Sequence, residues 1–363
     1  MHSAAPAFSP IRVLIADDSA VMREALCRAI ESTPTLQVCG TARRGEEALQ
    51  MVRDLKPDVI TLDVDMPDLD GIEVLRRIMF ESPRPVIMVS AATEQDADVT
   101  IEALNLGAFD YLHKLDSGHA VDPRRLKKEL IAKIEAAARS PLARSSRSVQ
   151  TAEQPPGIAV TQRPVTPEIV AIGTSTGGPQ ALQEILPNLP CDLPVAVIVV
   201  QHMPPGFTAP LAKRLNTLSA VDVREAEHGD IVRPGNVYIA PAGRHLRVRR
   251  RPEAKESLKA QICLSDHPAS MHKPSADVMM LSIAEAFGKY ACGIILTGMG
   301  ADGLQGMTAI SHAGGLTIGQ DEATSAVYGM PRVCAEHGVL HKVISLPQMP
   351  AQILQALHYK PKD

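Results

Sequence analysis

Short apolar runs alternate with amphipathic stretches through the first 138 residues of the chain. The apolar runs have the length of buried strands, and the stretches between them carry apolar residues at the three- and four-residue spacing of a helix. Strands that alternate with helices form a parallel sheet with helices on both faces, so we predict a doubly wound α/β domain. The predicted strands are 13–16, 36–41, 59–62, 86–89 and 109–112, and the predicted helices begin near residues 20, 46, 71, 96 and 125.

The same alternation returns after residue 167 and continues almost to the end of the chain. It predicts a second doubly wound domain, also α/β and mainly parallel, with a more antiparallel patch near residues 221–265. The predicted strands are 169–173, 195–200, 237–240, 293–297, 316–319 and 339–341, and the predicted helices are 179–186, 207–215, 276–287, 303–313 and 347–357.

A polar segment rich in serine, arginine and proline separates the two patterns. Residues 139–166 contain few large apolar side chains and show no period, so they cannot bury enough surface to fold alone. A chain of 363 residues also exceeds what one hydrophobic core usually supports. We therefore predict a first domain at 1–138, a flexible linker at 139–166 and a second domain at 167–363.

Polar side chains occur where the predicted strands of the first domain end. Asp17 and Asp18 follow the first strand, and Asp63 ends the third. Ser90 ends the fourth strand and Lys114 follows the fifth. Because the carboxyl ends of parallel strands meet at one edge of the sheet, we expect these five side chains to converge there.

Three carboxylates at one edge repel one another unless a hard divalent cation lies among them, and Mg²⁺ suits oxygen ligands that leave positions for water. Asp63 is then placed to accept a phosphoryl group, with Lys114 and Ser90 each contacting a phosphoryl oxygen. The alternative is that the first acid pair caps a helix and that 65–71 is an acidic turn. The joint placement at four strand ends favours the phosphorylation site.

A glycine-flanked serine follows the first strand of the second domain, in the run Gly-Thr-Ser-Thr-Gly-Gly-Pro at 173–179. Glycines permit a sharp turn from strand to helix, and the free N–H groups of the helix start suit a developing oxyanion. Ser175 is therefore a candidate nucleophile. The alternative is a glycine-rich turn whose serine caps the helix.

Two further strand ends of the second domain carry the partners that a nucleophile needs. His202 follows the second strand as a candidate base, and Asp302 follows the strand at 293–297 as the carboxylate that would orient it. The alternative for His202 is a strand-end histidine that is hydrogen-bonded locally, and the alternative for Asp302 is the N-cap of the helix that follows it. His228, His245 and His272 rank as lining residues, and the scattered histidines indicate no metal in this site.

Composition narrows the function classes. The formal net charge is −4 and the pI is about 6.3, so no overall basic field attracts nucleic acid or an anionic membrane. The arginine-rich run 244–251 alternates basic and apolar residues, which is typical of an edge strand with a solvated face. We expect no nucleic-acid binding, and docking onto an acidic protein surface suits this run better.

Cysteine usage and the N-terminus point to a cellular location. The six cysteines are scattered without a C-x-x-C pair, as expected of reduced thiols. The N-terminus lacks a secretion signal, and no apolar run approaches the ~20 residues of a membrane span. We expect a cytoplasmic protein that does not insert into a membrane.

The first domain resembles a response-regulator receiver, a flavodoxin-like fold, on the residues at its strand ends. The resemblance implies that Asp63 is the phosphoacceptor, that Asp17, Asp18 and Asp63 hold Mg²⁺, and that Asp65 adds its backbone carbonyl to the cation. It also implies switch roles for three residues on or after the last two strands. They are Ser90, Lys114 and the aromatic Tyr111.

The second domain resembles the catalytic domain of the chemotaxis protein-glutamate methylesterase (CheB) family. That resemblance implies hydrolysis of glutamate 5-methyl esters on the cytoplasmic helices of chemoreceptors, with release of methanol, and deamidation of selected glutamines. It assigns Ser175, His202 and Asp302 to a catalytic triad, and we take the backbone near Thr176 and Met299 as the oxyanion site. The matching segments are 173–179, 201–203, 234–235, 238–241, 273–275 with Asp277, 297–303, 320–322 and 328–331.

The receiver, linker and esterase arrangement implies that phosphorylation activates the hydrolase. The implied phosphodonor is the chemotaxis histidine kinase, and the implied substrates are methyl-accepting chemoreceptors. Two other functions stay open: a phosphorylation-switched scaffold, or a serine amidase that acts on another signalling protein. The first would need a broken triad, and the second would need no receiver.

Overall fold

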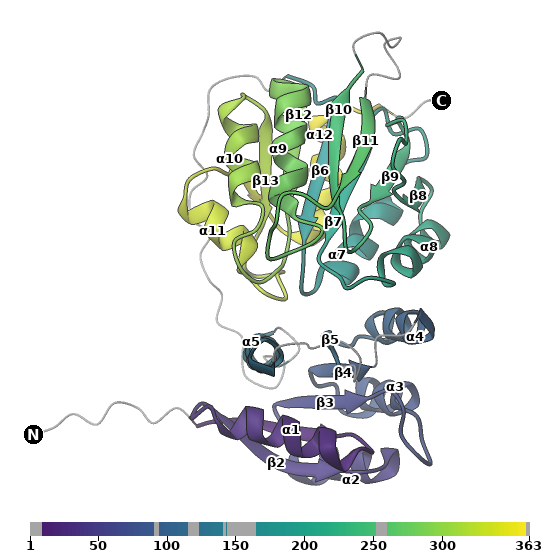
Figure 1. Cartoon of the computed structure of the whole chain (residues 1–363), viewed down its shortest axis with the longest axis vertical. Coiled ribbons are helices and arrows are strands. Elements are labelled where there is room, and N and C mark those ends of the chain that lie inside the picture. The colour runs from purple at the N-terminus through teal and green to yellow at the C-terminus, as the bar shows by residue number, and fades with distance from the viewer. Residues whose placement is uncertain are drawn as a thin grey trace, which may run out of the picture. The chain divides into compact units, whose positions relative to one another are not determined.

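The structure is a computed structural model that describes residues 9–90, 94–114, 123–140, 143, 165–251 and 260–360. The chain folds into two compact units, residues 1–150 and 151–363. Each unit has a parallel sheet with helices packed on it (Figure 1). The predicted linker at 139–166 lies almost entirely outside the described residues. None of the described helices combines the length and the apolar character needed to cross a membrane.

The first unit is a five-stranded sheet in the order β2-β1-β3-β4-β5, with all neighbours parallel. Helix α1 packs beside α5, and α3 packs beside both α2 and α4, so the central strands are covered and β3 and β4 are buried throughout. The strands are β1 Ile11–Ala16, β2 Leu36–Ala42, β3 Val59–Asp63, β4 Val86–Ser90 and β5 Asp110–His113. The helices are α1 Ala20–Glu31, α2 Gly45–Leu55, α3 Gly71–Glu81, α4 Glu94–Asn105 and α5 Pro123–Arg139.

The second unit has a seven-stranded parallel sheet in the order β14-β13-β12-β6-β7-β9-β8 and a separate antiparallel pair, β10-β11. The central strands β6, β7 and β12 are buried along their whole length. The strands are β6 Ile169–Thr174, β7 Ala196–Gln201, β8 Asp222–Glu225, β9 Asn236–Ile239, β10 His245–Arg250, β11 Ala260–Ser265, β12 Ala291–Ile295, β13 Leu316–Gln320 and β14 Lys342–Ile344.

Helices α9, α10 and α11 form one group in this unit, and α7 packs beside α8. Helix α9 also contacts both the main sheet and strand β10, next to which it is drawn in Figure 1. The helices are α7 Gly178–Ile185, α8 Thr208–Leu218, α9 Ala276–Phe287, α10 Leu304–His312, α11 Met330–Glu336 and α12 Met349–Ala356, with short 3-10 turns at Leu186–Asn188, Gly288–Tyr290 and Leu346–Gln348.

The arginine-rich run forms strand β10 as predicted. Leu246 and Val248 are buried against α9, whereas Arg247 and Arg249, which alternate with them, are exposed. This alternation buries one face of a two-stranded sheet and leaves the other in solvent. The run is therefore explained by packing on α9.

Three details of the second unit differ from the sequence prediction. The last strand is β14, at 342–344, because the apolar residues Val339 and Leu340 pack in the core instead of pairing. Helix α8 connects β7 to β8, and β9 lies between these two strands in the sheet and pairs in parallel with both. Among the described residues the antiparallel patch is therefore limited to β10 and β11, apart from one isolated bridge. Helix α11 was not predicted.

Candidate active site

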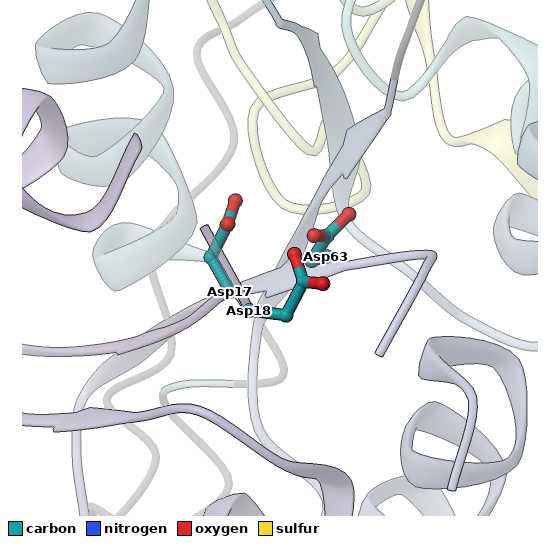
Figure 2. A group of neighbouring side chains, drawn as sticks. All are labelled: Asp17, Asp18 and Asp63. Carbon is teal, nitrogen blue, oxygen red and sulfur yellow. The ribbon is translucent and has the colours of Figure 1, made fainter. Parts of the chain in front are cut away.

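Three carboxyl groups of the first unit meet at the carboxyl edge of its sheet (Figure 2). Asp17 and Asp18 follow β1 and Asp63 ends β3, and one oxygen of each lies within 4.8 Å of the others. The Lys114 ammonium donates to Asp63 Oδ2 at 2.5 Å and lies 3.5 Å from Asp17 Oδ2. Asp65 has an exposed side chain, and its N–H donates to Asp63 Oδ1 at 3.2 Å. The predicted cluster is thus assembled.

Electrostatics at this edge suit a bound cation. Burial raises the pKa of Asp63 to about 6, with the negative charge of Asp17 adding to the rise and Lys114 opposing it. Burial also raises the pKa of Asp17, whose buried Oδ2 accepts no hydrogen bond from the described residues. Oxygen ligands on crowded carboxyl groups are the donor set that Mg²⁺ prefers. The residues present therefore fit the Mg²⁺ that receiver domains use.

Two of the predicted switch residues lie on neighbouring strands of the same sheet. Ser90 at the end of β4 is buried, and its hydroxyl shares a hydrogen bond of 3.2 Å with Thr100 on α4. Tyr111 on β5 is also buried, with the Lys133 ammonium 4.9 Å from the centre of its ring. Both side chains therefore link a strand to a helix.

The turn after β6 holds Ser175 in a rigid frame. The Ser175 N–H donates to Thr297 O at 3.0 Å, and Gln201 Nε2 donates to Ser175 O at 2.9 Å. Gly177 has φ of +77°, a conformation that favours glycine. A Cβ on Gly298 would stand 2.7 Å from Ser175 Cβ, so glycine is needed for this close approach. The predicted glycine-rich turn therefore fixes the position of the Ser175 side chain.

Register between adjacent strands places His202 beside this turn. Thr174 pairs with Gln201, so the next residues, Ser175 and His202, leave neighbouring strands together, and the His202 N–H donates to Thr174 O at 3.1 Å. His202 Nε2 lies 2.7 Å from Asp302 Oδ2, with both side chains about one-tenth exposed or less. His202 Nδ1 is buried and has no hydrogen-bond partner among the described residues. The three predicted residues are thus brought together.

Asp302 accepts hydrogen bonds from four donors. His202 Nε2 and the Ala276 N–H, at 2.6 Å, both contact Oδ2. The Ser275 hydroxyl at 2.7 Å and the Asp277 N–H at 3.1 Å contact Oδ1. Burial opposes ionisation, but these hydrogen bonds, led by the one from His202, hold the pKa of Asp302 well below its usual range. Asp302 is therefore a fixed anion.

Capping of its own helix does not explain Asp302. The N-cap of α10 is Gly303, with φ of +99° and no side-chain cap. The carboxylate turns instead to the start of α9, where it satisfies N–H groups that have no partner within that helix. The alternative that Asp302 is an N-cap of the helix it precedes is thus wrong.

The other histidines occupy distinct places. The ring of His272 stacks on that of His202, with centroids 4.2 Å apart and planes 5° apart. His228 accepts a hydrogen bond from the Leu264 N–H at 3.1 Å, and buried His245 contacts Pro268 O at 2.9 Å through Nε2. His312 is exposed at the end of α10. Of the lining histidines, His272 contacts the catalytic candidate directly.

The two backbone amides that are candidate oxyanion donors, the N–H groups of Thr176 and Met299, have no hydrogen-bond acceptor among the described residues. Thr176 is otherwise fixed, because its carbonyl accepts from Thr297 Oγ1 at 2.9 Å. Both amides belong to the two loops that meet beside Ser175.

Sequence reasoning missed three supporting residues, although each belongs to a segment that it singled out. Gln201 bridges the serine turn to the histidine, donating to His202 O at 3.1 Å as well as to Ser175 O. Thr297 accepts from Ser175 and from the Thr174 hydroxyl through its carbonyl. Ser275 contacts Asp302. Their polar side chains on buried segments were the available signal.

Fold and site define a class: a receiver unit with a phosphoacceptor-type acid cluster, followed by an α/β unit that carries a serine, histidine and aspartate set. A family model for CheB methylesterase matches residues 170–353, and one for the response regulator receiver domain matches residues 13–128. The chain belongs to the CheB methylesterase family.

Relatives of known name cover both units. A protein-glutamate methylesterase/protein-glutamine glutaminase of Pyrococcus abyssi is 44% identical over 96% of this chain and 94% of its own. One from Nitratidesulfovibrio vulgaris, numbered 2, is 41% identical over 96% of this chain and 100% of its own. The crystal structure of the Thermotoga maritima CheB methylesterase catalytic domain is 39% identical and covers 53% of this chain and 99% of its own, with a TM-score of 0.50.

Proposed function

We propose that this chain hydrolyses glutamate 5-methyl esters on chemoreceptors, with Ser175 as the nucleophile, and deamidates selected receptor glutamines. The observation that carries the proposal is the His202–Asp302 hydrogen bond of 2.7 Å at the strand end next to Ser175. The names of the full-length relatives support both reactions. Membership of the family supports the substrate class.

In the proposed reaction Ser175 Oγ attacks the carbonyl carbon of the ester and passes its proton to His202. Because Nε2 of His202 is engaged by Asp302, the unpartnered Nδ1 is the nitrogen that takes this proton. His202 then returns the proton to the leaving methoxide, which departs as methanol. Water, activated in the same way, hydrolyses the acyl-serine and leaves a glutamate carboxylate. With a glutamine side chain the leaving group is ammonia.

The free N–H groups of Thr176 and Met299 are the proposed donors to the oxyanion. Backbone donors fixed before the reaction stabilise negative charge without reorganising, which is where hydrolases of this chemistry gain much of their rate. Thr176 follows the nucleophile, and Met299 belongs to the loop that ends at Asp302. Two loops thus contribute one donor each.

The receiver is proposed to regulate this reaction. Asp63 is the proposed phosphoacceptor, and Mg²⁺ held by Asp17, Asp18, Asp63 and the carbonyl of Asp65 would neutralise charge on the phosphoryl oxygens. Ser90, Lys114 and Tyr111 are the proposed switch residues, and a chemotaxis histidine kinase is the proposed phosphodonor. The Lys114 ammonium donates to Asp63 Oδ2 at 2.5 Å, which supports a direct role for Lys114 in sensing the phosphorylation of Asp63.

Changing Ser175→Ala tests the proposed nucleophile. The full chain with this substitution should release neither methanol from a methylated receptor fragment nor ammonia from a glutamine-bearing one, because the attacking hydroxyl is gone. Ser311→Ala, a serine near the end of α10, is the matched control and should keep both activities. Methanol release at the wild-type rate from the Ser175 variant would overturn the proposed mechanism.

A further inference from the structure

The start of α9 is the part of the second unit that contacts Asp302 most extensively. Three consecutive residues, Ser275, Ala276 and Asp277, each donate one hydrogen bond to its carboxylate. Two of these donors are backbone N–H groups of the first helical turn, where the helix dipole also favours an anion. The third is a side-chain hydroxyl, which a substitution can remove alone.

Ser275 has two hydrogen bonds with opposite directions. It is the N-cap of α9, and its Oγ accepts from the Val278 N–H at 3.3 Å. The same Oγ donates its own proton to Asp302 Oδ1 at 2.7 Å. The side chain is buried, with 3% of its surface exposed, so water does not compete for that proton. The hydroxyl is therefore oriented by the helix and committed to the carboxylate.

A second link holds the loop of Asp302 from the other side. Asp277 Oδ1 accepts from the Gly306 N–H in the first turn of α10, at 2.9 Å. Helices α9 and α10 pack along each other, and Gly306 allows this because a Cβ there would lie 2.4 Å from Met280 Cβ. Asp302 thus lies between two helix starts that are fixed relative to one another.

We propose that Ser275 is a positioning residue for the hydrolytic reaction: by donating to Oδ1, its hydroxyl fixes the plane of the Asp302 carboxylate and withdraws negative charge from Oδ2, the oxygen that faces His202. It touches neither the substrate nor the reacting atoms. It acts through Asp302 on the orientation of the imidazole. The inference rests on the proposed function, since it assumes that His202 is the base.

Two measurable consequences follow. Without the hydroxyl, Oδ1 keeps a single, longer hydrogen bond and the carboxylate can rotate. We therefore expect kcat to fall about tenfold, close to the lower end of the effect of losing one hydrogen bond to a charged group, while KM changes little. The carboxylate oxygen that faces the imidazole also carries more negative charge once the hydroxyl is gone. The acid limb of the kcat/KM profile should therefore move upward.

Other ionisable groups near this carboxylate stay in place in such a variant. His202 follows β7, His245 begins β10, and Asp277 opens α9. His272 and Lys273 come from the loop before α9. Burial raises the pKa of Asp277 to about 6, and the nearby Asp302 charge adds to that rise. Because none of these groups is altered, a displaced acid limb reports on the hydroxyl.

Ser275→Gly in the full chain is the sharpest test. Glycine is an acceptable N-cap that costs only a few tenths of a kcal/mol, so the helix start survives while the donor to Asp302 disappears. Ser275→Thr retains a hydroxyl and should restore kcat and the acid limb. Ser282→Ala on the same helix removes another serine hydrogen bond, from the Val248 N–H at 2.9 Å, and controls for lost stability.

The readouts are methanol release as a function of pH and thermal unfolding by circular dichroism. We expect the glycine variant alone to combine near-normal unfolding, reduced kcat and an upward shift of the acid limb. A glycine variant with wild-type kcat, or with an acid limb that stays or moves down, overturns the inference. If Ser175→Ala instead retains activity, the proposed function fails, so the two failures are distinct.

Discussion

Asp63, the last residue of β3, and Asp302, in the loop after β12, are both largely shielded from solvent, but their pKa values shift in opposite directions. Burial raises the pKa of Asp63 to about 6. The pKa of Asp302 is lowered well below its usual range although burial opposes ionisation there too. Desolvation therefore does not decide the difference.

The neighbours decide it. Asp302 faces the start of α9 and receives four hydrogen bonds, so its charge is compensated before any ligand arrives. Asp63 faces another carboxyl group, Asp17, and among the described residues only Lys114 and the Asp65 N–H compensate its charge. A carboxylate whose oxygens all accept hydrogen bonds is suited to holding a base in one orientation. A carboxylate whose negative charge has few donors or cations around it is suited to binding a cation and accepting a charged group.

Of the substitutions that test this contrast, Asp302→Asn should reduce esterase activity the most. An amide offers one acceptor oxygen and an NH₂ that cannot accept, so at least one pair of the four donors loses its partner. By analogy with the same change in other triads we expect activity to fall about 10⁴-fold, because the imidazole is no longer held in the required tautomer. Methanol release from methylated receptor fragment measures this.

The free energy of unfolding of the Asp302→Asn variant should also fall, by about 1–3 kcal/mol, because buried N–H groups at the start of α9 lose their acceptor. Asp230→Asn is the matched control, since that carboxylate accepts from Arg224 and from the Glu227 N–H, and neither partner belongs to the serine, histidine and aspartate set. Activity of the Asp302 variant within tenfold of wild type would show that saturation of this carboxylate is a folding feature only.

The contrast also marks how far the sequence could predict the site. Ser175 and His202 were predictable because strand ends of a parallel sheet share one edge, and their strands β6 and β7 are neighbours in register. The acid cluster followed from the same rule. In both sites the residues are brought to the same edge by the order and register of the strands.

Contacts that depend on helix packing were not predictable in this way. The bond from Ser275 to Asp302 joins residues 27 positions apart through the packing of α9 on α10, which no local pattern encodes. The apolar residues Val339 and Leu340 resembled a strand because they pack in the core, whereas the true edge strand β14 is exposed at Lys342 and Val343 and carries little apolar signal.

Asp63→Asn tests the other half of the comparison. If the under-compensated carboxylate accepts the phosphoryl group, the stimulation of methanol release by a small phosphodonor with Mg²⁺ should disappear, because an amide oxygen does not replace the carboxylate nucleophile. Asp70→Asn is the matched control, since Asp70 caps α3 through the Glu73 N–H and asparagine caps equally well. Equal stimulation of the Asp63 variant and the wild type would move the phosphorylation site elsewhere.

The smallest effect concerns pH and Mg²⁺ at the acid cluster. Because the folded pKa of Asp63 is above its unfolded value near 4, the stability that its proton contributes is complete below pH 4 and is lost as pH rises through about 6. Mg²⁺ requires the ionised form, so its affinity should fall about fourfold from pH 7.5 to 5.5.

Thermal unfolding of the full chain with and without Mg²⁺ measures this dependence at each pH. The stabilisation by Mg²⁺ should be larger at pH 7.5 than at pH 5.5, and Asp63→Asn should weaken the dependence because the titrating group is gone. A stabilisation equal at both pH values would mean that Asp63 is already ionised at pH 5.5. The acid cluster would then be compensated as fully as Asp302 is, and the contrast between the two sheet edges would rest on geometry alone.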